Sequence, residues 1–200
     1  MTASPPTTRR RRETLARLLD AAATVFAQRG FGRTSIEEVC EAAGFTRGAF
    51  YSNFASLDEL FFALYEQRAG RVATQVAEAL AGRGERTVPA LVERVVAALS
   101  VDRDWTMIKT EYFLHAARHP DAAAALQRHR DAVVQALVPA LRDVVDLTAL
   151  PRSMRTPHTL ARAVVTVHDG STLDLLLDPD SEAHRQWLRA LLTALLEYRD

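Results

Sequence analysis

The chain of 200 residues carries 25 basic and 25 acidic residues, so its net charge alone gives no argument for a nucleic-acid partner. A single cysteine excludes an intramolecular disulfide, and 48% hydrophobic residues are ordinary for a globular protein. No apolar run reaches the ~18 residues of a membrane-spanning helix, and the N-terminus lacks the apolar core of a signal peptide. We therefore expect a cytoplasmic protein with no membrane partner.

The charges are unevenly distributed along the chain. Residues 1–54 hold eight arginines against five acidic residues, whereas the remainder holds 17 basic and 20 acidic residues. A basic N-terminal segment favours contact of that segment with nucleic acid, although a solvated arginine surface is the alternative.

The N-terminal region predicts an arm followed by a helix. Residues 1–9 are rich in Pro, Ser and Thr and are expected to be disordered. The basic run of residues 9–12 either reaches DNA phosphates or forms a solvated helical turn. A first helix is predicted over residues 10–29, because apolar residues recur there at helical spacing. Its apolar stripe consists of Leu15, Leu19, Ala22 and Phe26.

The segment Thr34–Phe54 predicts two short helices joined by a glycine turn. Either Thr34 or Ser35 can cap the first helix, since each has a glutamate three residues later, and Gly44 follows the last apolar residue. Thr46 is placed to cap a second helix at residues 47–52. This pattern is a helix-turn-helix, and its second helix carries arginine, hydroxyls and small residues that suit a major groove and its phosphates.

Six further helices are predicted after the helix-turn-helix. They cover residues 56–81, 86–100, 104–118, 121–147, 156–177 and 181–199. Pro139 inside the fourth predicts a kink or a break, and residues 150–157 are expected to form a loop. No segment shows sustained strand alternation, so the predicted class is all-α with about nine helices. The predicted organisation is the arm, a DNA-binding head over residues 10–55, and a helical body over residues 56–200 for ligand binding and dimerisation.

The last two predicted helices are apolar over more than one face. Such helices are either buried in one intramolecular core or shared with a partner. We favour a four-helix interface between two copies of the chain, because helix-turn-helix readers usually need two-fold symmetry. The candidate interface residues are Val164, Val167, Leu175, Leu188, Leu191, Leu192 and Leu195.

The N-terminal residues together resemble the DNA-binding domain of TetR-type (tetracycline-repressor-like) transcriptional regulators. The resemblance covers about residues 10–70 and rests on Gly30-Phe31-x-x-Thr34-Ser35-Ile36 and on the run from Ala42 to Phe54. The remainder resembles the family only in helix number and length, so no ligand carries over. The family implies contacts with phosphates or bases from Thr34, Ser35, Thr46, Arg47, Gly48, Ala49, Tyr51, Ser52 and Asn53. Arg47 would read a base, and guanine is the candidate because its two acceptors match paired donors.

Two positions depart from the family pattern. Asn53 stands where histidine is common, and it can still donate to a phosphate. Leu57 stands where family members usually have lysine, which removes one expected phosphate contact. That change could lower the affinity for DNA or move charge neutralisation onto the run of residues 9–12.

Other kinds of site receive little support from the sequence. Cys40 lies on the apolar face of the first reader helix, where packing is the expected role and redox sensing the alternative. Glu111, His115 and His119 have a helical spacing that could bind a metal, but His119 sits at a helix end before proline and we expect no metal. No catalytic motif is present, so we expect no enzyme activity, no catalytic residue and no cofactor.

Aromatic and polar residues of the body are candidates for a small-molecule cavity, although the same residue types fill any helical core. The candidates are Phe62, Trp105, Met107, Ile108, Glu111, Tyr112, His115 and His168. The sequence therefore predicts a homodimeric, ligand-responsive repressor that an unknown small-molecule effector releases from palindromic double-stranded operator DNA. The alternatives are a regulator that responds to no ligand and an all-α interaction module with only non-specific DNA affinity.

Overall fold

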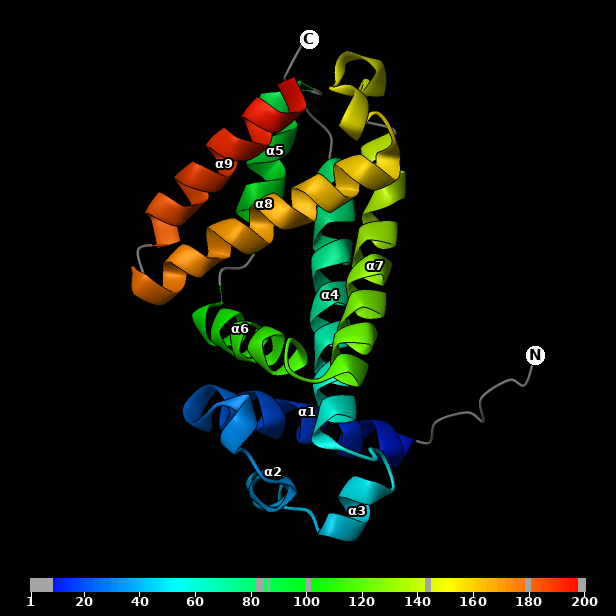
Figure 1. Ribbon diagram of the computed structural model, residues 1–200, viewed down its shortest axis with the longest axis vertical. Helices are drawn as coiled ribbons and strands as arrows, with labels where there is room; N and C mark the ends of the chain where they lie inside the picture. Colours follow the sequence, from blue (N-terminus) through cyan, green and yellow to red (C-terminus); the bar gives the residue numbers. More distant parts are fainter. Residues whose placement is uncertain are drawn as a thin grey trace, which may run out of the picture. The chain divides into compact units, whose positions relative to one another are not determined.

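The computed structural model of the chain is all-α (Figure 1). It describes residues 9–81, 85, 87–99, 102–142, 145–178 and 181–197. Within these residues there are nine α-helices and no strand. The α-helices are α1 (Arg9–Arg29), α2 (Ile36–Ala43), α3 (Arg47–Tyr51), α4 (Leu57–Ala81), α5 (Val88–Ala98), α6 (Arg103–Ala116), α7 (Pro120–Arg142), α8 (Pro157–Leu177) and α9 (Ser181–Glu197). The 3₁₀ helices are η1 (Phe31–Arg33), η2 (Leu147–Ala149) and η3 (Arg152–Met154).

The chain divides into two compact units. Unit 1 is Met1–Glu66 with Met107–Ala123, and unit 2 is Gln67–Thr106 with Ala124–Asp200. The divisions fall inside α4, α6 and α7 rather than in connecting loops. The predicted functional division into residues 10–55 and 56–200 stays a prediction.

Unit 1 is built on the buried face of α1, which packs against α2. Its buried residues recur three or four positions apart, as one face of a helix requires, and include Leu18, Leu19, Ala22 and Phe26. Phe50 of α3 and Phe54 just after it are also buried, with ring centroids 5.8 Å apart. Two aromatic anchors at one end of so short a helix hold α3 in the core while its other side stays exposed.

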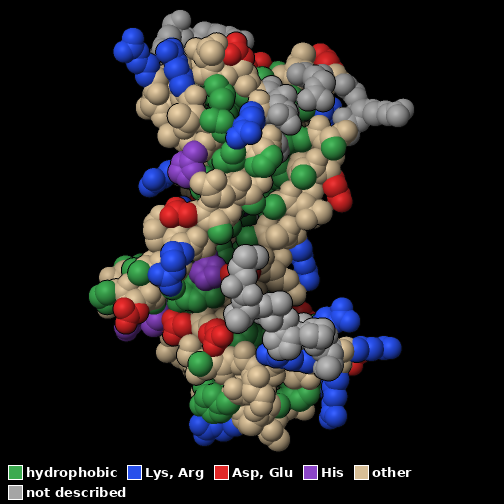
Figure 2. Space-filling model, turned by 90° about the vertical axis from the view of Figure 1, so that its right-hand side faces the viewer, with side chains coloured by type: hydrophobic (Ala, Val, Ile, Leu, Met, Phe, Trp, Pro, Cys, Tyr) green, Lys and Arg blue, Asp and Glu red, His purple; other side chains and the backbone are tan. Residues whose placement is uncertain are grey.

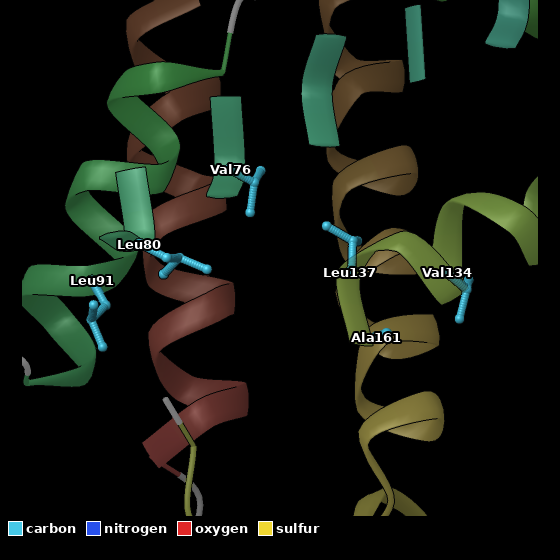
Figure 3. Close-up of a cluster of buried hydrophobic side chains, with 6 residues drawn as sticks. All are labelled: Val76, Leu80, Leu91, Val134, Leu137 and Ala161. Atoms are coloured by element: carbon cyan, nitrogen blue, oxygen red, sulfur yellow. The ribbon is translucent and has the colours of Figure 1, made fainter. Parts of the chain in front are cut away.

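Unit 2 contains a hydrophobic cluster to which four helices contribute. Figure 3 shows its six buried side chains, Val76 and Leu80 from α4, Leu91 from α5, Val134 and Leu137 from α7 and Ala161 from α8. A second cluster joins α5 and α9 through Val92, Val96, Leu188 and Leu192. Because non-adjacent helices share these clusters, unit 2 has a core of its own.

The structure confirms the predicted class and helix order and corrects some details. Of the kink or break predicted at Pro139, the break is wrong, because α7 runs through this residue and ends three residues later at Arg142; the kink stays a prediction. A proline so close to the helix end removes one backbone hydrogen bond from a turn that is already ending. The predicted loop over residues 150–157 contains η3.

Some predictions fall on residues that the structure does not describe. Of the disordered arm predicted over residues 1–9, residues 1–8 lie outside the described residues, and the prediction is wrong at Arg9, which is the first residue of α1. Among the helices of the described residues, none has the length and apolarity needed to cross a membrane.

Candidate nucleic-acid interface

The first helix of the predicted reader, α2, begins with a complete capping box at Ser35. The Ser35 hydroxyl accepts from the Glu38 N–H at 3.3 Å, and the Glu38 carboxylate accepts from the Ser35 N–H at 2.8 Å. That backbone hydrogen bond, together with the Ser35 hydroxyl and the charge of Arg29, lowers the pKa of Glu38. Thr34, the other candidate cap, is buried and donates its hydroxyl to the Gly30 carbonyl at 2.9 Å. Ser35 is therefore the cap, and the Thr34 hydroxyl donates to a backbone carbonyl of the same chain instead.

The turn between the two reader helices is fixed by Gly44 and by α1. Gly44 has φ 68° and ψ 37°, a left-handed conformation that glycine adopts without strain. Arg17 of α1 donates from Nη2 to the carbonyl of Ala43 at 2.7 Å, and its guanidinium lies 4.7 Å from the ring centroid of Phe45. One arginine thus caps the end of α2 and covers the first residue after the turn.

The second reader helix, α3, begins at Arg47 and exposes the side opposite Phe50. The Thr46 hydroxyl caps it by accepting from the Ala49 N–H at 3.3 Å. Thr46, Arg47 and Gly48 are exposed, and Tyr51 is 50% exposed. The Thr46 hydroxyl, the Arg47 guanidinium and the Tyr51 phenol are therefore accessible on the exposed side of α3, together with Gly48, which has no side chain.

Arg47 is held by contacts to two neighbours. Its Nη1 lies 2.7 Å from the carboxylate Oε1 of Glu37 on α2, and its Nη2 donates to the Tyr51 hydroxyl at 3.4 Å. The guanidinium carbon also lies 5.8 Å from the centroid of the Tyr51 ring. The residue expected to read a base thus has a defined position across the helix-turn-helix.

The remaining predicted reader residues differ in how far their polar groups are available. Ser52 donates its hydroxyl to the Gly48 carbonyl at 2.8 Å, and Asn53 donates its amide to the Ala49 carbonyl at 2.8 Å. Asn53 Oδ1 is buried with no hydrogen-bond partner. Ser52 and Asn53 thus stabilise the end of α3, and their contacts with DNA stay predictions.

Exposed arginines also lie on α1 of the same unit. Figure 2 shows blue side chains projecting from the part of the surface that unit 1 forms. The first four residues of α1 are arginines and all are exposed, and Arg9 pairs with Glu13 at 2.9 Å. Exposed cations in the unit that carries the reader supply the sequence-independent attraction that phosphates require.

Six of the eight predicted ligand residues lie in unit 1, and three of them make contacts within it. Glu111 accepts from the Phe31 N–H at 2.7 Å, and Tyr112 donates to Asp58 Oδ1 at 2.7 Å. His115 Nε2 lies 3.3 Å from the same Asp58 oxygen. The fully buried Tyr112 ring stacks on Phe61 with centroids 3.7 Å apart, and burial followed by the Asp58 hydrogen bond raises the pKa of Tyr112.

The other three unit 1 candidates are mostly packing residues. The Phe62 ring packs edge-on to Tyr112, with centroids 5.3 Å apart. Ile108 is buried and Met107 is half-buried. A ligand role for these six residues is untested, and their described contacts tie α6 to the beginning of α4 and to η1.

The two remaining ligand candidates lie in unit 2. The Arg68 guanidinium lies 5.4 Å from the Trp105 ring, and Asp102 accepts from the Trp105 N–H at 2.9 Å while it pairs with Arg68. His168 Nδ1 lies 3.8 Å from Asp169. A ligand role for Trp105 and His168 stays a prediction.

The predicted interface residues of α8 and α9 fall into two groups. Leu175, Leu188 and Leu192 are buried within the chain, the last two against α5. The remaining four are half-buried and comprise Val164, Val167, Leu191 and Leu195. The most exposed apolar side chains of these helices are others, namely Leu177 at 91%, Trp187 at 55% and Leu173 at 45%. The sequence did not single out these three residues, because both helices are apolar on more than one face. On such a helix the sequence does not indicate which apolar side chains are exposed.

Sequence reasoning also missed Arg17, Glu37 and Asp58. Arg17 and Asp58 act on residues 26 and 54 positions away, and no local pattern indicates such contacts. Glu37 could have been found, because it lies in the first turn of α2 and faces a reader arginine across a short turn. Cys40 is buried, and desolvation raises its pKa, as the packing role requires.

Metal binding gains no support from the described residues. No group of three or more His, Cys, Asp and Glu side chains is arranged there to hold a metal ion. His119 stacks on His115 with ring centroids 4.1 Å apart and contacts the His115 carbonyl.

Comparison with known proteins agrees with this geometry. Residues 18–64 match the family model described as bacterial regulatory proteins, tetR family, and residues 82–198 match the tetracyclin repressor-like C-terminal domain. The regulator UidR of Escherichia coli is 23% identical over 185 residues, which cover 92% of this chain and 93% of UidR.

Two solved structures have the same fold. GusR of Salmonella enterica superposes with a TM-score of 0.72 at 24% identity, over 95% of this chain and 98% of GusR. The multidrug binding protein EbrR, solved with imidazole, superposes with a TM-score of 0.64 at 26% identity, over 93% of this chain and 96% of EbrR. The α2–turn–α3 arrangement and the two matched domains show that the chain belongs to the TetR family of helix-turn-helix transcriptional regulators.

Proposed function

We propose that the protein is a homodimeric repressor that binds a palindromic operator through α3 of each copy and that a small molecule releases from DNA. The observation that carries this proposal is the exposed side of α3, where Arg47, Gly48 and Tyr51 are accessible together with Thr46, whose hydroxyl caps the helix. Hydroxyl and guanidinium donors bind phosphates and base edges, and a short exposed helix can enter a major groove.

Gly48 supports close approach of DNA to α3. A Cβ at this position would meet only the Thr46 hydroxyl oxygen, at 3.7 Å, so packing within the chain does not require glycine. Glycine inside a helix is less favourable than alanine by about 0.5–1 kcal/mol. A phosphate or base edge that approaches the backbone would explain why this position lacks a side chain.

The second copy would cover the exposed apolar side of α8 and α9. Leu173, Leu177 and Trp187 expose large apolar side chains there. Two helices from each copy form a four-helix interface, and two-fold symmetry places two readers on the two halves of a palindrome. The half-buried Val164, Val167, Leu191 and Leu195 would lie at its edge, and Leu175, Leu188 and Leu192 would support it from within.

An effector would act through α6. This helix carries Glu111 and Tyr112, which contact η1 and the start of α4, so an effector that favours another position of α6 would change the support of the reader. The effect cannot exceed the difference between the effector's affinities for the two states. The description of EbrR as a multidrug binding protein supports a small molecule as effector.

The DNA-binding part of the proposal is tested on a duplex that the wild-type protein selects from a random pool. Fluorescence anisotropy would compare this operator with a random duplex of equal length. Arg47→Ala should weaken operator binding by roughly 10-fold or more, because a bidentate base contact discriminates by about 1–3 kcal/mol. Tyr51→Ala should weaken it as well.

The matched control is Arg128→Ala, which removes an exposed arginine of α7 in unit 2. Its operator affinity should equal that of the wild type. If neither reader substitution weakens operator binding relative to this control, the assignment of α3 is wrong. Equal affinity of the wild type for operator and random DNA at all salt concentrations would instead favour an interaction module with non-specific affinity.

The dimer is tested by sedimentation. Leu173→Glu should convert the dimer to a monomer, because it places a charge in the proposed apolar interface. Leu114→Glu is the matched control, since Leu114 of α6 is similarly exposed at 55% but lies in the other unit. A dimer that survives Leu173→Glu and Trp187→Glu would contradict the proposed interface.

A further inference from the structure

We infer that Glu37 determines DNA specificity by holding the Arg47 guanidinium in place and by withholding its charge from phosphates. The inference rests on the proposed reading of a base by Arg47. Glu37 affects the ratio of the affinity for operator DNA to the affinity for random DNA, rather than whether the protein binds DNA.

The geometry of three side chains supports a positioning role. Glu37 is the second residue of α2 and Arg47 the first of α3, so their ion pair at 2.7 Å spans the turn of the reader. Tyr51 contacts the same guanidinium from one helical turn further on, through its hydroxyl at 3.4 Å. A long side chain that two neighbours already restrain loses less conformational freedom when it binds DNA.

The exposure of this group keeps it accessible to DNA. The side chains of Arg47 and Glu37 are 60% and 55% exposed, and both contacts run through the terminal nitrogens of the guanidinium. A guanidinium carries five N–H donors in a rigid fork, so donors remain for an acceptor outside the protein. Arg47 can therefore meet a base edge while it keeps its contact with Glu37.

The charge of Glu37 discriminates against random DNA. A phosphate that binds Arg47 there meets a guanidinium whose charge the carboxylate already neutralises, so it gains little. Glu37 itself also repels phosphates. A matching base pair offers neutral acceptors, so its bidentate contact with Arg47 depends less on the net charge of the pair. Glu37 is thus a repulsive element that lowers affinity for the wrong partner more than for the right one.

The test measures operator and random affinities of Glu37→Gln at several salt concentrations. Random DNA should bind about two- to fivefold tighter, and the operator-to-random ratio should fall by a similar factor, as expected for an exposed ion pair. The salt dependence for random DNA should steepen by about 0.9 in log–log slope, because the released Arg47 neutralises one more phosphate. Glu37→Asp, which restores the charge on a shorter side chain, should give an intermediate ratio.

Two further variants separate this role from simple charge and from helix stability. Glu41→Gln removes an exposed charge from the same helix, and it should change both affinities equally. In an Arg47→Ala background, Glu37→Gln should leave the ratio unchanged. An unchanged ratio for Glu37→Gln alone, or the same fall without Arg47, would overturn the inference. If Arg47→Ala itself leaves the ratio unchanged, base reading by Arg47 is wrong and the inference falls with it.

Discussion

Replacing Gly30 by alanine should destabilise unit 1 through two separate effects. Gly30 has φ 84° and ψ 148°, a conformation that other residues adopt only under strain. A Cβ there would also lie 2.6 Å from Glu111 Oε2, the oxygen that accepts the Phe31 N–H. The flexible Glu111 side chain would move away, and the N–H of the buried Phe31 would lose its partner.

The expected magnitude follows from these two effects. Backbone strain of this kind costs about 1–3 kcal/mol, and loss of a hydrogen bond to a charged group costs about 1.5–3 kcal/mol. Together they give about 2.5–6 kcal/mol, a large part of the ~5–15 kcal/mol by which domains are stable.

Urea unfolding at one fixed protein concentration measures this cost. In a Glu111→Ala background the cost of Gly30→Ala should fall to the strain alone, about 1–3 kcal/mol. Gly32→Ala is the matched control, because a Cβ there meets nothing within 4 Å. A Gly30→Ala variant as stable as Gly32→Ala would refute the reasoning, and an equal cost in both backgrounds would refute the part assigned to Glu111.

Three further substitutions test local features by the same measurement. Ser35→Ala removes the cap of α2 and should cost about 1 kcal/mol, whereas Ser153→Ala, at an exposed position in η3, should cost under ~0.5 kcal/mol. Leu137→Ala leaves a cavity in the cluster of Figure 3 and should cost about 2–5 kcal/mol; a cost below ~1 kcal/mol would contradict this packing. Burial lowers the pKa of His184 from 6.5, so the unfolded chain binds its proton more tightly and stability should fall as the pH drops below about 6.5. His184→Gln should reduce this pH dependence, and an unchanged profile would contradict the assignment.

The sequence predicted the reader well because its signals are local. A cap, a left-handed glycine and a second cap lie within thirteen residues, and each acts on a neighbour three or four positions away. The sequence left the choice of cap open between Thr34 and Ser35. The structure decides for Ser35, because the path of residues 30–34 brings the Thr34 hydroxyl to the Gly30 carbonyl, which precedes the helix.

The sequence did not predict the contacts of α6, because its partners are distant along the chain. Glu111 and Tyr112 have the composition of a ligand site, but their described partners are Phe31, 80 residues earlier, and Asp58, 54 residues earlier. Hydrophobic periodicity reports which face of a helix is buried and not what covers it. The same limit applies to α8 and α9, where it could not separate Leu188, inside the chain, from Leu177, outside it.

The discontinuous composition of unit 1 matters for anyone who wishes to exchange readers between regulators. A chimera joined after residue 55 would carry Phe31 into a foreign protein that lacks Glu111 and Tyr112. In this chain the Glu111 carboxylate accepts a hydrogen bond from the Phe31 N–H, and the Tyr112 ring packs against the Phe31 ring. The graft would then fail by losing stability, even with every DNA-facing side chain intact. A transferable reader from this chain is two pieces of sequence, Met1–Glu66 and Met107–Ala123, and the second piece carries none of the residues predicted to contact DNA.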